Sequence, residues 1–347
     1  MLKTITVTHF RNITKSQTFS CGFCTLIHGP NASGKTNLLE AIYVLNYAHG
    51  FRSSDIRDLF SYESHDFFVS GEMANDNNLQ HYKVYIKNGA FLEKAYFING
   101  IKKNLKAFQS RTTPIVLFQP SDLLLVTGNP SIRRGYVDTI LLRMDPAYRH
   151  AKTNYDHGLY KRNKLLIHMK GGSFEQVINF WDTFLETNAT ILHAKRTALV
   201  EYFNENSKFE GMEFKIGYEP NAYTKECSLQ SRATDLRTGR TSFGPQLDEF
   251  ILLKKYESAF RKLSSYGSRS EQRLGVLWLK RTELMCLVET LGVAPLFLLD
   301  DIFSELDEEN SKRIVNIARD YQTFMTTAHL DMLKHITYPI TKIELGR

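Results

Sequence analysis

The chain has 347 residues, of which 42% are hydrophobic and 23% are charged, with a formal net charge of +7. This composition is ordinary for a globular protein, with core material for one large or two modest domains. No apolar run approaches the length of a membrane span, and the N-terminal segment MLKTITVTHFRN lacks the apolar core of a signal peptide. We therefore expect a cytoplasmic protein without a membrane partner, and the positive charge favours a polyanion as partner.

The first strong motif is a phosphate-binding loop. The apolar run 23–28 predicts a buried strand, and residues 29–36 read GPNASGKT, which fits G-x-x-x-x-G-K-S/T. The glycines allow a tight turn close to phosphate, and the loop N–H groups would form an anion nest. Lys35 would reach the β- and γ-phosphates, and Thr36 would ligate Mg²⁺. The residues expected to hold the nucleotide are Gly29, Pro30, Asn31, Ala32, Ser33, Gly34, Lys35 and Thr36.

The residues on either side of this loop predict its surroundings. Apolar residues follow at a helical spacing over 37–46, and the N-terminus of that helix would add partial positive charge beneath the phosphates. Asn99-Gly100 predicts a hairpin turn. We expect an antiparallel sheet beside the nucleotide-binding core, made from the short β-rich runs 4–9, 67–73, 82–87 and 95–98.

From about residue 132 the pattern becomes helical. Residues 155–169 and 174–202 predict long helices separated by Gly171-Gly172, and another helix is expected over 271–291, directly after Ser268. A stripe on the second helix predicts packing between helices rather than ligand binding, and its members are Trp181, Phe184, Leu185, Asn188 and Leu192. The helices lack sustained heptads, so we expect a compact arm and no long coiled coil. Two further strands are expected, at 214–218 and 250–253.

The second half of a nucleotide site lies near the C-terminus. Residues 295–299 predict a buried parallel strand that ends in Asp300 and Asp301. Asp300 would hold Mg²⁺ directly or through water, and Asp301 would orient or deprotonate the attacking water. The alternative for this pair is helix capping or solvation of a strand end.

Another strand is expected at 321–327, after a helix from about Glu308, and His329 lies just past its end. A histidine there can sense a γ-phosphate, or it can be structural or exposed. Because the phosphate loop and Asp300 are far apart, the chain between them must leave the nucleotide domain and return. We expect an α/β protein with a discontinuous ATPase lobe, 1–131 and 271–347, and a mainly helical second lobe, 132–270.

Together these motifs resemble the RecF family, the ABC-type ATPases of bacterial recombinational DNA repair. The resemblance covers nearly the whole chain, and two blocks are specific to the group: LFQPSDLLLVTGNPSIRRGYVD at 117–138 and LLDDIFSELD at 298–307. Other matching segments are FRN at 10–12, the phosphate loop with its helix, FRS at 51–53, ING at 98–100, YKRNKLL at 160–166 and SRSEQR at 268–273.

The resemblance implies an ABC-type, SMC-like P-loop ATPase head that works as a homodimer with ATP and Mg²⁺. Each ATP would lie between the phosphate loop of one subunit and the signature segment of the other. Ser268 falls on the signature serine, Asp307 on the D-loop aspartate and His329 on the switch histidine, so the catalytic set would be Lys35, Asp301 and His329. Gln119 lies near the Q-loop position, and two residues match positions that resemble nucleotide or DNA contacts, Arg11 and Arg52.

The resemblance also implies a function. ATP binding would close the homodimer on double-stranded DNA near gaps or junctions with single-stranded DNA, and slow, DNA-stimulated hydrolysis would reopen it. In repair, replication and the SOS response, such a protein would help mediator proteins load the RecA recombinase, and it would associate with the nucleoid.

Basic residues supply candidate DNA contacts. Phosphates attract such clusters regardless of base sequence, although a solvated surface is an equal alternative. The candidates are Arg52, Lys102, Lys103, Lys106, Arg133, Arg134, Lys161 and Arg162, and Arg133-Arg134 can instead pair with acids inside the fold.

The chain departs from the family pattern at three places. Ala32 stands where the loop usually has glycine, Ser270 stands where the signature has glycine, and the GPHRDDL-like segment reads GPQLDEF at 244–250. A Cβ at the first two positions hinders close approach to phosphate. Two alternatives therefore stay open: a nearly inactive ATPase that uses ATP to support a DNA-binding module, and an ABC-type ATPase of another genome-maintenance or defence system.

Overall fold

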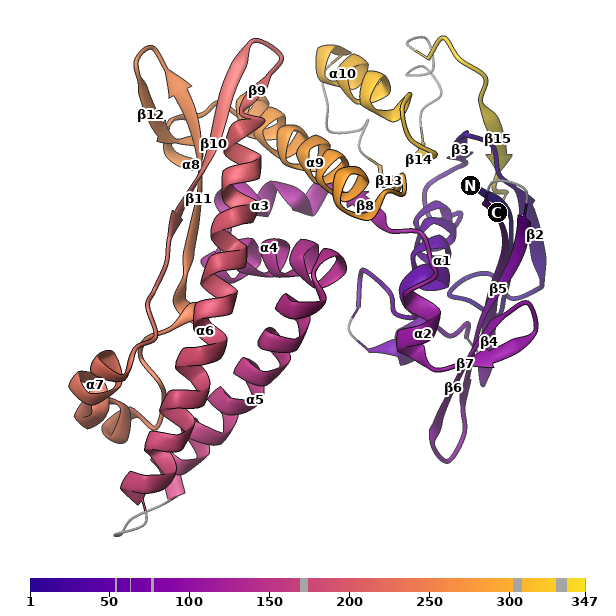
Figure 1. Cartoon of the computed structure of the whole chain (residues 1–347). Coiled ribbons are helices and arrows are strands. Elements are labelled where there is room, and N and C mark those ends of the chain that lie inside the picture. Colours follow the sequence, from indigo (N-terminus) through magenta and orange to yellow (C-terminus); the bar gives the residue numbers. More distant parts are fainter. Residues whose placement is uncertain are drawn as a thin grey trace. The chain divides into compact units, whose positions relative to one another are not determined.

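The computed structural model describes residues 1–53, 55–62, 64–75, 78–168, 174–301, 308–328 and 336–346 (Figure 1). The chain divides into two compact units, Met1–Ser121 with Leu287–Arg347 and Asp122–Cys286. The first unit is discontinuous, as the spacing of the motifs predicts. Its inserted partner is longer at both ends than the predicted lobe 132–270.

A five-stranded parallel sheet forms the centre of the first unit. Its strands are apolar and buried, because a parallel sheet is covered on both faces. The predicted strands at 23–28, 295–299 and 321–327 are confirmed, whereas the two outer strands, each of four residues, lack a pattern long enough to predict. The strand order is β15 (Thr341–Glu344), β3 (Cys24–His28), β14 (Thr323–Thr327), β13 (Leu296–Leu299) and β8 (Ile115–Phe118).

A six-stranded antiparallel sheet accompanies it, as predicted. Asn99 and Gly100, with φ of 50° and 76°, form the expected tight turn between its last two strands. The strand order is β2 (Gln17–Ser20), β1 (Leu2–Thr8), β4 (Asp66–Asn75), β5 (Asn78–Asn88), β6 (Leu92–Ile98) and β7 (Ile101–Lys103). The short helices of this unit are η1 (Ile56–Leu59), α2 (Leu105–Gln109) and α10 (Glu308–Ala318).

Helix α1 (Lys35–Tyr47) contacts both sheets, packing against β14 of the parallel sheet and β4 of the antiparallel sheet. Six apolar side chains around its circumference are at most 1% exposed: Leu38, Leu39, Ala41, Ile42, Val44 and Leu45. A helix that is buried on every side has no polar face. The helix that carries Lys35 and Thr36 is therefore fixed by one hydrophobic core that both sheets share.

The two sheets of the first unit are also joined by one buried amide. The Gln322 side chain accepts a hydrogen bond from Leu2 N at 2.7 Å and donates to Leu2 O at 2.7 Å and to Gly22 O at 2.9 Å. These bonds tie the residue before β14 to β1 and to the segment that enters β3. Because the backbone groups are buried, the amide satisfies polar atoms that would otherwise be costly.

The second unit is built on long helices, and α5 and α6 lie side by side in it (Figure 1). Leu185 and Leu192 of the predicted stripe are fully buried between helices, which confirms packing as its role. The helices are η2 (Pro120–Leu123), α3 (Leu124–Thr127), α4 (Pro130–Met144), α5 (Pro146–His168), α6 (Phe174–Glu205), α7 (Lys225–Thr238), η3 (Pro245–Leu247) and α8 (Leu263–Tyr266). An antiparallel sheet completes the unit, in the order β12 (Ala259–Lys262), β11 (Glu249–Tyr256), β10 (Met212–Glu219) and β9 (Lys208–Phe209).

Helix α9 (Arg269–Leu291) explains the wider boundary of the second unit. Its Trp278 is 0% exposed, stacks on Phe214 of β10 with ring centroids 5.7 Å apart, and donates its indole N–H to Asn206 O at 2.8 Å. The first turns of α9 therefore pack with residues 122–268, and the division falls inside α9 instead of at 270/271. Within the described residues, no helix is both long and apolar enough to cross a membrane.

Replacing Gln322 with Leu is expected to lower the free energy of unfolding by about 2–4 kcal/mol, because Leu2 N–H, Leu2 C=O and Gly22 C=O lose their partner. Urea unfolding measures the loss. The same change at the exposed Gln17 of β2 is the control and should stay near wild type. Equal stability of the two variants would show that water replaces the amide at no cost.

Candidate nucleotide-binding site

The segment 29–34 joins β3 to α1, which is the strand–loop–helix context that the phosphate-loop motif requires. Both glycines are needed there. Gly29 has φ of 154°, and an added Cβ would lie 2.3 Å from Leu345 O. Gly34 has φ of 98°, and an added Cβ would lie 2.6 Å from the amide of Asn12. The positive φ angles and the close contacts with Leu345 O and the Asn12 side chain thus favour glycine at these two positions.

Lys35 begins α1 and is 9% exposed. Its ammonium donates hydrogen bonds to two carbonyls of the loop, Gly29 O and Pro30 O, both at 2.9 Å. The charge is therefore held across the loop. Phosphate oxygens can replace these two acceptors with stronger, charge-assisted bonds.

Thr36 and Asp300 are 264 residues apart in sequence, yet Thr36 Oγ1 donates to Asp300 Oδ1 at 2.8 Å. Thr326 Oγ1 donates to the same oxygen at 2.9 Å. Burial raises the pKa of Asp300, and the two hydroxyl donors partly offset the rise. A buried carboxylate beside a hydroxyl offers the oxygen ligands that Mg²⁺ prefers, so these residues fit the predicted metal.

Asp301 and Gln119 lie at the same edge of the parallel sheet. Asp301 follows Asp300 with φ of 44°, a left-handed conformation that Asp tolerates, and its N–H donates to Thr326 Oγ1 at 2.8 Å. Gln119 directly follows β8, where Phe118 O accepts the N–H of Asp300 at 2.9 Å. Within the first unit, the fold therefore brings the phosphate loop, both aspartates and Gln119 together. The strand-end pattern predicts this place for the aspartates, and the resemblance implies it for Gln119.

Glu40 is a site residue that the sequence motifs did not identify. It is 0% exposed in the middle of α1, and its carboxylate accepts from Arg11 Nε at 2.9 Å and from Arg52 Nη2 at 2.6 Å. Burial alone would raise the pKa of Glu40, but the bonds from Arg52 and Arg11 lower it below its ordinary value. The signal in the sequence is a single acid within the apolar run LLEAIYVL, which a buried helix tolerates only when the acid is paired.

The two arginines carry one more positive charge than Glu40 neutralises. Arg52 Nη2 also donates to Asn37 Oδ1, and Asn37 Nδ2 donates to Asn12 Oδ1 at 2.6 Å. Asn12 lies against Gly34 of the loop. Arg11 Nη2 is buried with no hydrogen-bond partner in the described structure. An unpaired donor beside an excess cation fits an anionic ligand at this end of α1.

Ala32 stands where the phosphate loop of the family usually has glycine. Its φ of 65° is left-handed, a conformation that costs an L-residue roughly 1–2 kcal/mol and costs glycine nothing. At Ala32 the backbone therefore adopts a conformation that glycine adopts more readily, and the strain lies where phosphate would bind.

The predicted signature serine, Ser268, lies in the second unit immediately before α9. Glu271 N donates to Ser268 Oγ at 3.3 Å, and Ser268 N donates to a Glu271 carboxylate oxygen at 2.8 Å. This reciprocal pair is a capping box, which gives hydrogen-bond partners to two backbone N–H groups at the start of a helix. Ser270 lies exposed in the first turn of α9. The other two predicted members of the site, Asp307 and His329, lie outside the described residues.

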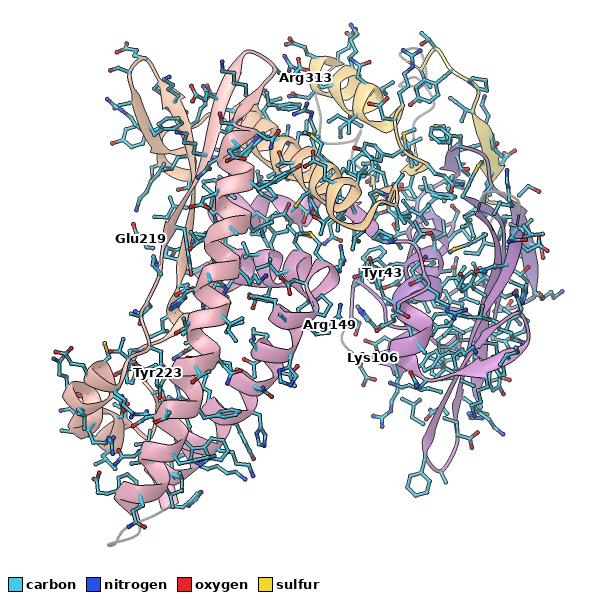
Figure 2. The ribbon with its side chains drawn as sticks, in the orientation of Figure 1. Tyr43, Lys106, Arg149, Glu219, Tyr223 and Arg313 are labelled. Atoms are coloured by element: carbon cyan, nitrogen blue, oxygen red, sulfur yellow. The ribbon has the colours of Figure 1, made fainter. Side chains whose placement is uncertain are left out.

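The predicted DNA contacts divide by exposure. Lys102, Lys106 and Lys161 are exposed, and Lys103 is partly exposed; Figure 2 shows Lys106 on α2. Arg52 is half exposed and bound to Glu40. The alternative of pairing with an acid holds for Arg133 of α4, which bonds Glu249 at 2.8 Å, whereas Arg134 donates to the backbone carbonyl of Asp248 at 2.9 Å.

The prediction that Arg162 contacts DNA is wrong. Arg162 is 0% exposed, and its guanidinium bonds Asp182 and Asp235, each at 2.7 Å. Tyr223, labelled in Figure 2, donates its hydroxyl to the same Asp182 at 2.9 Å. A buried arginine needs such partners, because an unpaired charge in the interior is very costly. Its neighbour Lys161 on α5 is exposed.

Comparison with protein families gives one match that spans residues 1–343, to the model described as the RecF/RecN/SMC N terminal domain. A "DNA replication and repair protein RecF" from Caldanaerobacter subterraneus is 32% identical, with 94% of this chain and 93% of that protein covered. The protein of the same name from Halalkalibacterium halodurans is 28% identical, with 99% and 98% covered.

Solved structures give the same result. The chain is similar to the recombination mediator protein RecF of the RecFOR pathway in two states. With ATPrS the TM-score is 0.85 at 27% identity, covering 99% of this chain and 96% of that one, and with ATP it is 0.84 at 29%, covering 100% and 98%. An SMC head bound to ScpA has a TM-score of 0.56 at 16% identity, covering 96% and 91%. These likenesses confirm the predicted ABC-type, SMC-like fold without a long coiled coil.

Replacing Glu40 with Gln is expected to lower the free energy of unfolding at pH 7 by about 2 kcal/mol, less than for a fully buried pair because both arginines keep some solvent contact. Since the folded pKa of Glu40 is lowered, its contribution is complete above the ordinary value of 4.5 and is lost as the pH falls through the folded pKa. The difference from wild type should therefore shrink in acid. Chemical unfolding across pH tests this, with the exposed Glu93→Gln as control; a difference that does not depend on pH would contradict it.

Proposed function

The chain belongs to the RecF/RecN/SMC N-terminal domain family and, within it, to the RecF proteins of DNA replication and repair; on this premise we propose that it is an ATP-dependent DNA-binding protein of recombinational repair. The observation that carries the proposal is the hydrogen bond between Thr36 and Asp300. It joins the phosphate loop to the strand-end carboxylate that a nucleotide-bound metal requires.

ATP would bind with its phosphates along 29–36, where the loop N–H groups and the Lys35 ammonium face them. Thr36 and Asp300 would hold Mg²⁺, which supplies charge neutralisation for the β- and γ-phosphates. Asp301 would orient or deprotonate the attacking water. The support for this role is its place at the carboxyl end of β13, next to Asp300.

We further propose that the complete site needs two copies of the chain. The phosphate loop and Asp300 belong to the first unit, whereas Ser268 belongs to the second. In a homodimer closed by ATP, Ser268 and Asp307 of one copy would face the nucleotide of the other, and His329 would contact the γ-phosphate. The likeness to RecF with ATP supports this assignment.

DNA would bind through phosphate contacts from exposed lysines, with the candidates reduced to Lys102, Lys103, Lys106 and Lys161. Such contacts release counterions, so affinity should fall steeply with salt. We propose gapped duplexes and junctions of single- and double-stranded DNA as targets. Mediator proteins that load the RecA recombinase are the proposed partners, by family resemblance; the similar solved RecF proteins are described as belonging to the RecFOR pathway. Hydrolysis would be slow and stimulated by DNA, and it would open the closed homodimer and release the DNA.

A second candidate is an ATP-binding module with almost no turnover. The left-handed Ala32 favours it, because a strained loop with a Cβ holds phosphate less closely than glycine would. Phosphate release with and without DNA separates the two candidates.

Lys35→Ala is expected to abolish ATP binding, because no other ammonium is held across the loop in the described structure. Asp301→Asn is expected to keep ATP and to accumulate the closed dimer on DNA, because water activation is lost while Thr36 and Asp300 remain. Sizing of the protein with ADP, ATP and a gapped duplex across a salt series measures both effects.

The exposed Lys3→Ala variant is the control for the loss of one charge and should behave like wild type. If Asp301→Asn stays monomeric with ATP and binds DNA no better than wild type, the proposed switch is wrong. If Lys35→Ala loses DNA binding while Asp301→Asn binds DNA as wild type does, bound ATP supports DNA binding without closure of the dimer.

Replacing both Ala32 and Ser270 with Gly is expected to raise the rate of phosphate release by roughly tenfold, because glycine removes two Cβ atoms that limit the approach to phosphate. Steady-state phosphate release measures the rate. The matched change Ala107→Gly in α2, outside the site, should leave the rate unchanged. If the rate of phosphate release is unchanged in the double variant, the Cβ atoms of Ala32 and Ser270 do not limit turnover.

A further inference from the structure

Lys254 of β11 is a buried cation that belongs to no motif. It is 8% exposed, and its ammonium forms an ion pair with Glu271 and lies 4.3 Å from the ring centroid of Tyr256. A buried ammonium is stable only when it is paired. The ion pair therefore belongs to the folded second unit, and it joins the sheet of that unit to the first turn of α9.

Glu271 connects this cation to Ser268. One carboxylate oxygen binds Lys254, and the other accepts from Ser268 N at 2.8 Å and from the Tyr256 hydroxyl at 3.2 Å. The Glu271 N–H in turn donates to Ser268 Oγ at 3.3 Å. Lys254 and Tyr256 thus hold the acid of the capping box in place from outside the helix.

This arrangement sets the direction of the serine hydroxyl. A hydroxyl has one donor and two acceptor positions. In Ser268, an acceptor position is used by Glu271 N–H, while the residue itself is exposed. Its O–H donor is therefore available to an incoming acceptor, at a helix N-terminus whose partial positive charge favours an anion.

The same pair of strands also holds α9 further along. Lys254 is paired in register with Phe214 of β10, and the Phe214 ring stacks on Trp278 of α9. The sheet thus fixes α9 at its first turn by charge and two to three turns later by aromatic packing. Lys254 of β11 therefore reaches Ser268 through a single intermediate residue, Glu271.

We propose that Lys254 is a positioning residue for the signature serine: by holding Glu271 it directs the Ser268 hydroxyl to the γ-phosphate bound in a second copy of the chain. The inference rests on the proposed function, because it requires that Ser268 acts on the nucleotide of the partner. It adds a residue that lies outside the signature segment and on a different element.

The first test compares three lysine variants of the full chain. Lys254→Met keeps the apolar stem and removes the charge; Glu271 is partly exposed and can be hydrated, so the fold should persist. We expect phosphate release to fall roughly tenfold, while the ATP dissociation constant of the dilute monomer stays unchanged, because Lys35 and Thr36 lie in the other unit. Lys254→Arg should recover part of the rate. Lys255 lies next to Lys254 on β11, and Lys255→Met, which removes an exposed ion pair with Glu213 of β10, should match wild type.

The second test mixes variants, so that a positioning defect can be told from a fold defect. An equimolar mixture of Lys254→Met with Lys35→Ala forms dimers in which one site combines an intact loop with an intact signature, and about a quarter of all sites should then be active. The dimer fraction at saturating ATP is a second readout that slow turnover does not hide.

A mixture of Ser268→Ala with Lys35→Ala serves as the reference. If both mixtures recover, the inference is supported. If only the reference recovers, or if Lys254→Met equals wild type, the role of Lys254 is overturned and the composite site stands. If neither mixture recovers, the composite site fails, and the inference fails with it.

Discussion

The site depends on one carboxylate oxygen, at which hydrogen bonds from separate segments of the chain meet. Asp300 Oδ1 accepts hydrogen bonds from Thr36 at the start of α1 and from Thr326 in β14. Three separate segments of the chain must therefore reach the same edge of the parallel sheet before the metal ligands stand together. The sheet meets this demand with a strand order in which β13 and β14 lie side by side and β3 lies next to them. The burial that raises the pKa of Asp300 is the cost of this convergence, and the two hydroxyls offset part of it.

Local chemistry explains what could be predicted from the sequence. The phosphate loop, the strand before it and the aspartates at 300 and 301 are fixed by short-range rules of turn, strand and helix, and the structure places them as expected. Glu40 escaped prediction because its arginine partners come from loops that meet only in the fold. Helix α7 escaped because it is polar along most of its length, so no apolar period marks it. The boundary within α9 depends on Trp278, whose stacking partner Phe214 lies far away in sequence.

Net charge was a poor guide to the surface for a similar reason. Arg162 and Arg196 are each at most 1% exposed, and both are enclosed by aspartates of the second unit. The planar guanidinium with its five donors suits such interior networks, whereas a lysine ammonium is more strongly hydrated and is buried here where it is paired, as in Lys254. A count of basic residues therefore mixes two populations. Arg162 and Arg196 join elements inside the second unit, and the exposed lysines carry the field that a polyanion would meet.

The place of β3 in the parallel sheet has a consequence for biosynthesis. Both of its neighbours, β14 and β15, are translated roughly three hundred residues after it, and so is Gln322, which binds the segment entering β3. A nascent chain on the ribosome would hold β3 as an unpaired apolar strand through most of its synthesis. Strand pairings between residues so far apart in sequence form slowly, and the exposed apolar surface favours aggregation until they form. The second unit, a continuous stretch, can fold earlier by itself. ATP binding would thus become possible only after the strands that flank β3, which precedes the phosphate loop, have left the exit tunnel.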